Sequence, residues 1–301
     1  MHAVVLVSGG AAVTPFTTPD AGARTGLAAG NTMTAVRAHL LRAGHAVFTA
    51  PARIGPGTVA DDTGWQGFSD VPAELPAAMT INAAGTIADA GHALHTFLAH
   101  LTATFDLDRI DVVAHSMGGL FTRAALGQSR ADPSVAPLSR LVTLGTPWSG
   151  SLLGDVLAGD IRLEDAHEDP ATIAILEQSR EYADRVSQGA AGQVSHAFLA
   201  GADGWNDTQR GALDDISVTL IGGSFFASAD QPPTLWPHDG LVALRSASAR
   251  EVSDAVLPRR TIHEVDDVHS IYLADRFGLS WDRALTWDPR VFDLIDGALR
   301  A

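Results

Sequence analysis

The chain reads Ile110-Asp111-Val112-Val113-Ala114-His115-Ser116-Met117-Gly118-Gly119, an apolar run that ends in a small-residue turn and opens a helical pattern. A serine between a buried strand and a helix, with small residues two positions before and after it, is typical of a nucleophile elbow. Ala114 and Gly118 must be small because the helix packs closely on the strand at so sharp a turn. The turn aims the Ser116 hydroxyl and the Met117 N–H at the same space. A serine that only caps the following helix would also fit this motif, but its position directly after an apolar strand favours a nucleophile.

Other apolar runs lie on both sides of this stretch and are separated by helical patterns. Short, near-continuous apolar strands that alternate with helices indicate a parallel sheet buried on both faces. The sequence therefore predicts an α/β fold with a mostly parallel sheet flanked by helices. The predicted strands are Val4–Ser8, Ala46–Ala50, Ile110–Ala114, Leu141–Gly145, Ile216–Gly222 and Thr261–Val265.

Four helices are predicted around these strands. Apolar residues recur at helical spacing from about Asn82 to Thr104, which predicts an amphipathic helix. Asn31 or Thr32 can cap a helix that runs to Arg42. A helix from Met117 to Gln128 must follow the third strand. The terminal helix is marked by Val291, Leu294, Ile295 and Leu299.

Two stretches interrupt the alternation. Pro51 to Pro76 is rich in Pro, Gly and Asp and predicts a long excursion. Ser149 to Asp215 is far longer than a crossover requires and carries helical patterns without a convincing strand. We expect residues 1–148 and 216–301 to form the core, and residues 149–215 to be a helical cap or lid inserted into it. A second small domain unrelated to function is the alternative.

Composition excludes several classes of chemistry. All 20 basic residues are arginine and cysteine is absent, so Schiff-base lysines, thiolate metal sites and cysteine nucleophiles cannot be built. The formal net charge of −15 disfavours nucleic-acid partners and anionic membrane surfaces. No metal and no cofactor is expected.

The N-terminal segment and the lengths of the apolar runs bear on where the protein acts. The run Ala3 to Val7 is short and ends in glycines, which is typical of a buried strand and not of a signal peptide. No apolar run approaches the ~18 residues of a spanning helix. We expect a cytoplasmic protein as given, secreted if a leader has been removed, with no integral membrane segment. The oligomeric state stays open.

A serine nucleophile needs an imidazole base. In an α/β fold the base follows the serine and the acid along the chain, which leaves His238, His263 and His269. His263 lies inside the last predicted strand, whereas His269 lies on the loop just past it. A loop position lets the imidazole reach back to Ser116, so His269 is the predicted base and His263 the alternative.

The acid should follow the fifth strand. Asp239 lies in Pro237-His238-Asp239-Gly240-Leu241-Val242, where a glycine permits a tight turn before the chain re-enters the core. Asp230 is nearer the strand and remains the alternative. His238 is then expected to line the site rather than act as the base.

An oxyanion also needs backbone donors. Met117 supplies one predicted N–H, and the glycine turn after the first strand supplies the other. In that turn, Val7-Ser8-Gly9-Gly10, we predict Gly10 as the donor, with Ala11 as the next choice.

These sequence motifs resemble those of the α/β-hydrolase superfamily, and within it those of the bacterial lipases and esterases. The resemblance rests on the serine string, on Leu144-Gly145-Thr146-Pro147-Trp148-Ser149-Gly150-Ser151, which is similar to the segment that enters the lid, and on the acid and glycine strings. It implies a serine nucleophile, an acid at Asp239 and a base at His269. The family usually has His-Gly where this chain has Ser8-Gly9, and no calcium ligands of the family can be matched.

The combined reading is hydrolysis of a small-molecule or lipid-like ester by a catalytic triad and an acyl-enzyme. Thioester or amide hydrolysis by the same triad is the alternative, and a non-catalytic binding protein is a further one. An apolar acyl pocket is predicted from aromatic and aliphatic loop residues, although cap-to-core packing would explain the same residues. They are Trp65, Phe68, Trp148, Leu152 and Trp236.

Overall fold

The computed structural model describes residues 1–13, 33–60, 67–68, 73–129, 132–185, 190–228 and 235–301. Its centre is a six-stranded sheet whose neighbouring strands are all parallel. The order β10-β9-β8-β7-β1-β2 puts β8 and β7 at the centre and β10 and β2 at the edges. The strands are β1 (His2–Val7), β2 (Ala46–Thr49), β7 (Arg109–His115), β8 (Leu138–Leu144), β9 (Ser217–Gly223) and β10 (Arg260–Val265).

The six strands correspond to the six apolar runs in the sequence, and this part of the prediction is confirmed. Strand β1 shows the physical reason. Its side chains alternate between two hydrophobic clusters, with Val5 and Val7 in one and Val4 and Leu6 in the other. A strand that is buried on both faces is apolar at successive positions, as a parallel sheet covered by helices requires.

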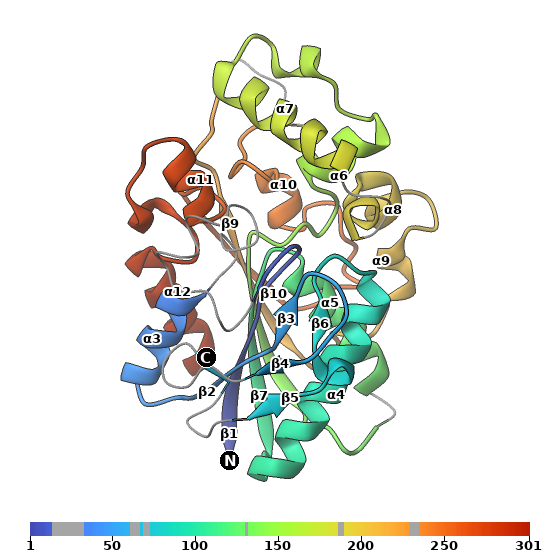
Figure 1. Ribbon diagram of the computed structural model, residues 1–301, viewed down its shortest axis with the longest axis vertical. Coiled ribbons are helices and arrows are strands. Elements are labelled where there is room, and N and C mark those ends of the chain that lie inside the picture. The colour runs from blue at the N-terminus through green and yellow to red at the C-terminus, as the bar shows by residue number, and fades with distance from the viewer. Residues whose placement is uncertain (14–32, 61–66, 69–72, 130–131, 186–189, 229–234) are drawn as a thin grey trace.

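Helices cover both faces of this sheet (Figure 1). On one face α4 (Ile87–Phe105) and α5 (Gly118–Ser129) pack against each other and share the cluster that contains Val5 of β1. On the other face α3 (Thr34–Arg42) and α12 (Pro289–Arg300) share the cluster that contains Leu6. The serine turn between β7 and α5 therefore lies at the carboxyl edge of the sheet centre.

The helix predicted from Asn82 begins later, at Ile87. Thr86 caps it, because the Thr86 hydroxyl accepts the Asp89 N–H at 3.1 Å and donates to the Asp89 carboxylate at 2.7 Å. Asn82 belongs instead to β6 (Ile81–Asn82), which pairs with β3 (Ala52–Arg53) in a small parallel sheet. Asn31 and Thr32, the predicted caps of α3, lie outside the described residues.

The excursion after β2 contains only short elements in its described part. In addition to β3, strands β4 (Val59–Ala60) and β5 (Glu74–Leu75) form an antiparallel pair. The turn η1 (Ala77–Met79) follows and leads into β6.

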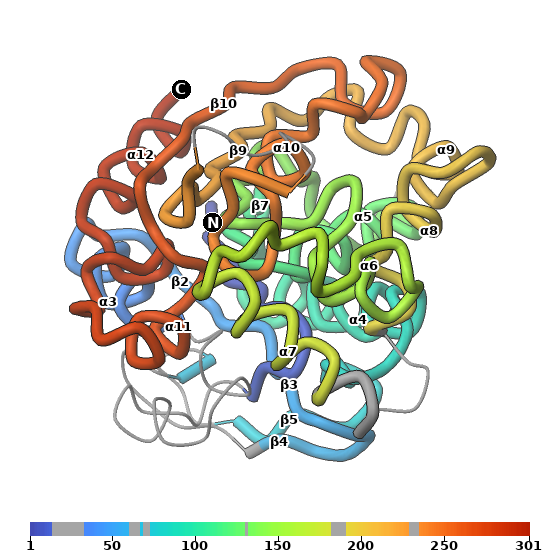
Figure 2. Tube along the Cα trace, turned by 90° about the horizontal axis from the view of Figure 1, so that it is seen from above, coloured from blue at the N-terminus to red at the C-terminus, as the bar shows by residue number. Residues whose placement is uncertain are grey.

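Between β8 and β9 the described residues form helices and turns. The helices α6 and α7 lie beyond the carboxyl ends of the strands, and both are in front when the molecule is seen from above (Figures 1 and 2). They pack on later parts of the chain, since Leu152, Ile175 and Leu176 share a cluster with Trp236 and Ile271. The elements are α6 (Leu152–Ala158), η2 (Leu163–Ala166), α7 (Pro170–Arg185), η3 (Ala190–Val194), α8 (His196–Ala200) and α9 (Trp205–Thr208).

Three short elements complete the chain: α10 (Leu244–Ala247), α11 (Ile271–Arg276) and η4 (Trp281–Arg283). Within the described ranges, none of the helices combines the length and apolar character needed to cross a membrane.

Candidate active site

Ser116 occupies a strained turn between β7 and α5. Its φ of 55° is in the left-handed region, which a residue other than glycine, asparagine or aspartate rarely adopts. The turn is fixed from the neighbouring strand β8 and the loop after it. The Ser116 N–H donates to the carbonyl of Leu144 at 2.8 Å, and the Thr146 hydroxyl donates to the carbonyl of Ser116 at 2.7 Å.

Glycines make room for this turn. A Cβ on Gly118 would lie 2.2 Å from the carbonyl oxygen of Val7. A Cβ on Gly9 would lie 2.6 Å from Cβ of Ser116 and 2.8 Å from the Met117 nitrogen. The backbone after β1 therefore passes directly against the serine turn, and both positions require glycine.

Asp239 and His269 form a buried pair at the same edge of the sheet. Oδ2 of Asp239 lies 2.7 Å from Nδ1 of His269, and both side chains are fully buried. Oδ1 of Asp239 accepts the backbone N–H groups of Leu241 at 2.9 Å and Val242 at 2.7 Å. The carboxylate thus has donors on both oxygens, and Nδ1 of His269 carries the proton because Oδ2 accepts it.

Gly145 is the point where the serine turn and this pair meet. It follows β8 in the left-handed region, at φ 57°. A Cβ there would lie 2.9 Å from both Oδ2 of Asp239 and Nδ1 of His269. Since the residue before it holds the N–H of Ser116, the three predicted catalytic residues gather around one short loop. Nε2 of His269 is buried and has no hydrogen-bond partner among the described residues.

Of the alternative base and acid, the structure describes only the base. His263 lies within edge strand β10, in register with Ile221 of β9, and so not at the carboxyl end of the sheet where His269 lies. Asp230 lies outside the described residues.

His238, the residue before Asp239, is a buried neutral imidazole. Its Nδ1 accepts the Gly240 N–H at 3.1 Å, so the proton is on Nε2, which lies 3.1 Å from the Thr172 hydroxyl of α7. Burial lowers the pKa of His238 to about 4. His238 therefore joins the loop of Asp239 to helix α7 through its two ring nitrogens.

The predicted oxyanion donors lie beside the serine turn. In the part of the chain that is described, no acceptor takes the N–H of Met117. Gly10 lies against the same residue, since a Cβ on Gly10 would be 2.7 Å from Sδ of Met117. Ala11, the next choice in the sequence, donates its N–H to the carbonyl of Ala83 at 2.9 Å. The N–H of Ala11 is therefore committed to a structural bond.

The predicted pocket residues fall in different surroundings. Trp148 is fully buried, and its ring packs 4.6 Å from the Arg123 guanidinium carbon. Phe68 is also buried, in the main hydrophobic cluster. These surroundings favour a role for Trp148 and Phe68 in core packing over a role in lining the predicted acyl pocket. Trp236 lines a cavity of about 480 Å³, and it shares a cluster with Leu152 of α6. Trp65 lies outside the described residues.

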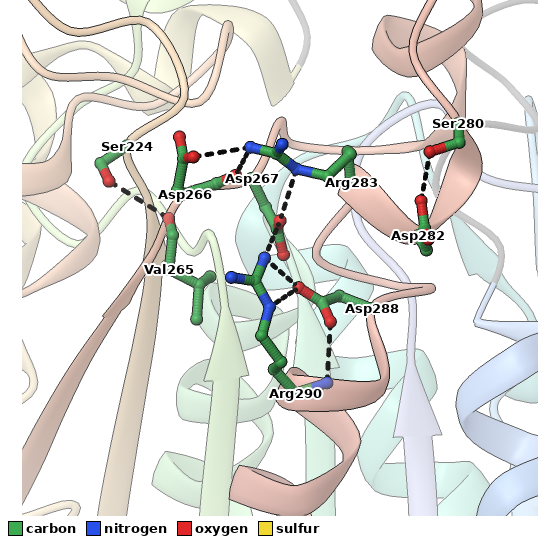
Figure 3. A network of polar contacts seen from close by, with 9 residues as sticks. All are labelled: Ser224, Val265, Asp266, Asp267, Ser280, Asp282, Arg283, Asp288 and Arg290. Atoms are coloured by element: carbon green, nitrogen blue, oxygen red, sulfur yellow. Dashed lines mark hydrogen bonds and ion pairs between the residues drawn. The ribbon is translucent and has the colours of Figure 1, made fainter.

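A charged network holds the loop that leads to His269 (Figure 3). Asp267 is fully buried, and its Oδ1 accepts from Nη2 of Arg290 at 3.0 Å. Arg290 also donates from Nε to Oδ2 of Asp288 at 2.7 Å, and Arg283 donates to Oδ2 of Asp266 at 2.7 Å. Burial and the neighbouring Asp288 carboxylate raise the pKa of Asp267 to about 8.

No group of three or more His, Asp or Glu side chains in the described ranges is arranged to hold a metal ion. The chemistry that the assembled groups can perform is proton transfer and nucleophilic attack. A buried imidazole, oriented by a carboxylate, lies at the same loop as a serine on a strained turn.

Comparison with known proteins identifies the fold. Residues 76–182 match a family described as alpha/beta hydrolase of unknown function (DUF915). The mature form of the lipase BlEst2 from Bacillus licheniformis superposes with a TM-score of 0.50 at 16% identity, covering 91% of this chain and 89% of that one. The lin2722 gene product of Listeria innocua gives a TM-score of 0.48 at 15% identity, with coverages of 99% and 94%. The carboxylesterase CesB from Bacillus subtilis gives 0.43 at 14% identity, with coverages of 99% and 83%.

No curated protein matches the sequence. The family match and the BlEst2 superposition agree with the parallel sheet flanked by helices. The chain has the α/β-hydrolase fold, as its sequence motifs predicted.

Proposed function

We propose that this protein is a serine hydrolase that cleaves carboxylic esters of apolar acyl groups. The observation that carries the proposal is the hydrogen bonding of the two ring nitrogens of His269. Nδ1 is bound to Asp239 at 2.7 Å, while Nε2 has no partner among the described residues. An imidazole prepared in this way is the general base that a serine nucleophile needs. The backbone N–H of Ser116 is bonded to Leu144, the residue before Gly145, against which the imidazole packs.

The proposed reaction uses these groups in turn. Nε2 of His269 takes the proton from Ser116 as its oxygen attacks the ester carbonyl. The resulting imidazolium is stabilised by Asp239, and it then protonates the leaving alcohol. A water molecule, activated by the same imidazole, hydrolyses the acyl-enzyme and frees Ser116.

The negative oxygen that forms on the carbonyl carbon needs donors. We assign this role to the backbone N–H groups of Met117 and Gly10, which flank the serine. Removal of one such donor typically costs ~3–4 kcal/mol of transition-state stabilisation.

The proposed substrate is a neutral ester with an apolar acyl group. Residues 149–215 act in this proposal as a cap over the site, and Leu152 and Trp236 supply apolar surface near it. The net charge of −15 disfavours anionic substrates. The structural similarity to the lipase BlEst2 from Bacillus licheniformis supports the same substrate class.

A substrate panel tests the reaction type. Purified protein is assayed with p-nitrophenyl esters of increasing acyl length, acyl-CoA thioesters and anilides. We expect the esters to have the highest kcat/KM, and Ser116→Ala to lower ester kcat by ~10⁴–10⁶-fold. Faster turnover of thioesters or anilides would replace the ester assignment and keep the triad. An unchanged rate in Ser116→Ala would overturn the mechanism.

A further inference from the structure

His115, the residue before the proposed nucleophile, contacts the proposed base directly. Its Nε2 lies 2.9 Å from the backbone carbonyl oxygen of His269. The two imidazole rings have centroids 4.5 Å apart and are tilted by 45°. Both side chains are fully buried. The contact joins residues 154 positions apart in the sequence.

The contact defines the protonation of His115. A carbonyl oxygen can only accept, so the proton of the neutral imidazole is on Nε2. Nδ1 is buried without a partner among the described residues, and it therefore gains nothing from a second proton. Burial and the proximity of His269 hold the pKa of His115 well below its usual range. His115 is a neutral donor whose ring adds no positive charge beside the imidazolium that forms on His269.

Both backbone polar groups of His269 are held by segments that carry the other two proposed catalytic residues. Its N–H donates to the carbonyl of Asp239 at 2.8 Å, and its carbonyl accepts from His115, the neighbour of Ser116. Because the peptide on each side of Cα is fixed, the direction of the Cα–Cβ bond is fixed as well. The bond from Asp239 to Nδ1 then sets the rotation of the ring.

We infer that His115 is a positioning residue for hydrolysis at this site: its Nε2–H holds the backbone of His269 so that the free Nε2 of His269 faces the serine. The inference rests on the proposed function. The sequence alone favours a packing role for His115, because adjacent residues on a turn point apart. Packing alone would be satisfied by any ring of the same size, whereas positioning requires a donor at one location.

Three variants separate the two roles. His115→Phe keeps an aromatic ring and removes the donor. His115→Gln loses the ring but carries an amide N–H at the place of Nε2, the same number of bonds from Cβ. His115→Asn carries its amide at the place of Nδ1 and does not reach the carbonyl. His95→Phe is the control, because it makes the same substitution at a hydrogen-bonded histidine outside the candidate site, where the ring nitrogens contact Ser129 and Asp132.

Each variant is titrated with a fluorophosphonate to count reactive sites, so that kcat is expressed per labelled protein and misfolded material does not contribute. We expect kcat for a p-nitrophenyl ester to fall ~10- to 100-fold in His115→Phe and His115→Asn, the size of effect that a small misplacement of a catalytic group produces. KM should stay within about threefold. His115→Gln should recover most of the loss, and His95→Phe should match the wild type.

The outcomes distinguish the inference from the function on which it rests. If wild-type protein is labelled at Ser116 and hydrolyses the ester, the proposed function holds whatever the variants do. Equal kcat per labelled site in the wild type and in His115→Phe then overturns the positioning role. A loss in His115→Gln as large as that in His115→Phe also overturns it, since the donor would not be what matters. Absence of labelling and turnover in the wild type overturns the proposed function itself.

Discussion

Asp239 and His269 are joined twice, by side chain and by backbone. Oδ2 of Asp239 lies 2.7 Å from Nδ1 of His269, and the N–H of His269 donates to the carbonyl oxygen of Asp239 at 2.8 Å. The second bond fixes the backbone from which the imidazole projects, and the first fixes the tautomer. Asp239, the proposed acid, therefore contacts His269, the proposed base, through both its carboxylate and its backbone.

Substitution of the acid should affect catalysis far more than folding. Asp239→Asn keeps the shape and the backbone bonds, but its amide can donate to Nδ1 and so favours the wrong tautomer of His269. We expect kcat to fall by ~10⁴-fold, with a circular dichroism spectrum like that of the wild type. The matched control is Asp230→Asn, which should leave kcat unchanged. A large loss in Asp230→Asn with activity retained in Asp239→Asn would exchange the two assignments.

Substitution of glycine by alanine should have opposite effects on the stability of the protein at the two ends of α5. A Cβ on Gly118 would lie 2.2 Å from the Val7 carbonyl, whereas a Cβ on Gly127 would meet nothing within 4 Å. We expect Gly118→Ala to destabilise the protein by ~1–3 kcal/mol or more and to abolish ester turnover. Gly127→Ala should stabilise it by ~0.5–1 kcal/mol, because alanine favours the helix. Urea unfolding measures both, and a stable, active Gly118→Ala would contradict the close approach of β1 to the serine turn.

Arg123 is a buried cation between two indole rings. Its guanidinium carbon lies 4.6 Å from the ring centroids of both Trp148 and Trp205. Nη1 donates to Asn206 at 2.9 Å, and burial lowers the pKa of Arg123 to about 9. The residue thus links the helix after the serine to α9.

Removal of this side chain should be costly because of its volume. Arg123→Ala leaves a cavity between the rings, and we expect a loss of ~2–5 kcal/mol in the free energy of unfolding. Arg123→Met fills most of the space without a charge that needs solvation, so its loss should be clearly smaller. Unfolding curves in urea give the two values. Equal losses would mean that the charge, and not the packing, is what Arg123 contributes.

Asp267 should make stability depend on pH. The pKa of this carboxyl is raised to about 8 by burial and by Asp288, while in an unfolded chain it is ~3.9. The folded protein therefore holds more protons than the unfolded chain between these values. Its free energy of unfolding should fall as pH rises through that window.

The variant Asp267→Asn isolates this effect, because it keeps a neutral group and removes the titration. The difference in unfolding free energy between wild type and variant should decrease steadily from pH 5 to pH 8, whereas other groups cancel in the comparison. Chemical denaturation at several pH values measures it. Parallel curves for the two proteins would show that Asp267 is already ionised at pH 5.

Local patterns in the sequence were enough to predict the sheet. Strand β1 is a continuous apolar run because helices cover both faces of the sheet there, and this signal needs no knowledge of distant residues. Edge strand β10, in contrast, is mostly exposed. The start of α4 was predicted wrongly, although Thr86-Ile87-Ala88-Asp89 has the spacing of a helix cap and carries the signal for it. The hydrophobic period extends past that cap to Asn82, and for this reason periodicity alone placed the start too early.

The contacts around the candidate site depend on distant parts of the chain and could not be read in the same way. Gly145 meets Asp239 and His269 only because three neighbouring strands end at one edge. His115 reaches a carbonyl 154 residues away, and nothing in its own neighbourhood predicts this. Trp148 lies on a loop after β8, yet its ring packs on the guanidinium of Arg123 in α5, a cation–π contact between segments that are separate in the sequence.

The measurement that tests the central claim most directly is covalent labelling of the nucleophile. Purified protein is treated with a fluorophosphonate, digested and mapped by mass spectrometry. We predict a single adduct on Ser116, absent in Ser116→Ala, much slower in Asp239→Asn and His269→Ala, and blocked by an ester substrate in excess. An adduct on another residue, or ester turnover without any adduct on Ser116, would contradict the account.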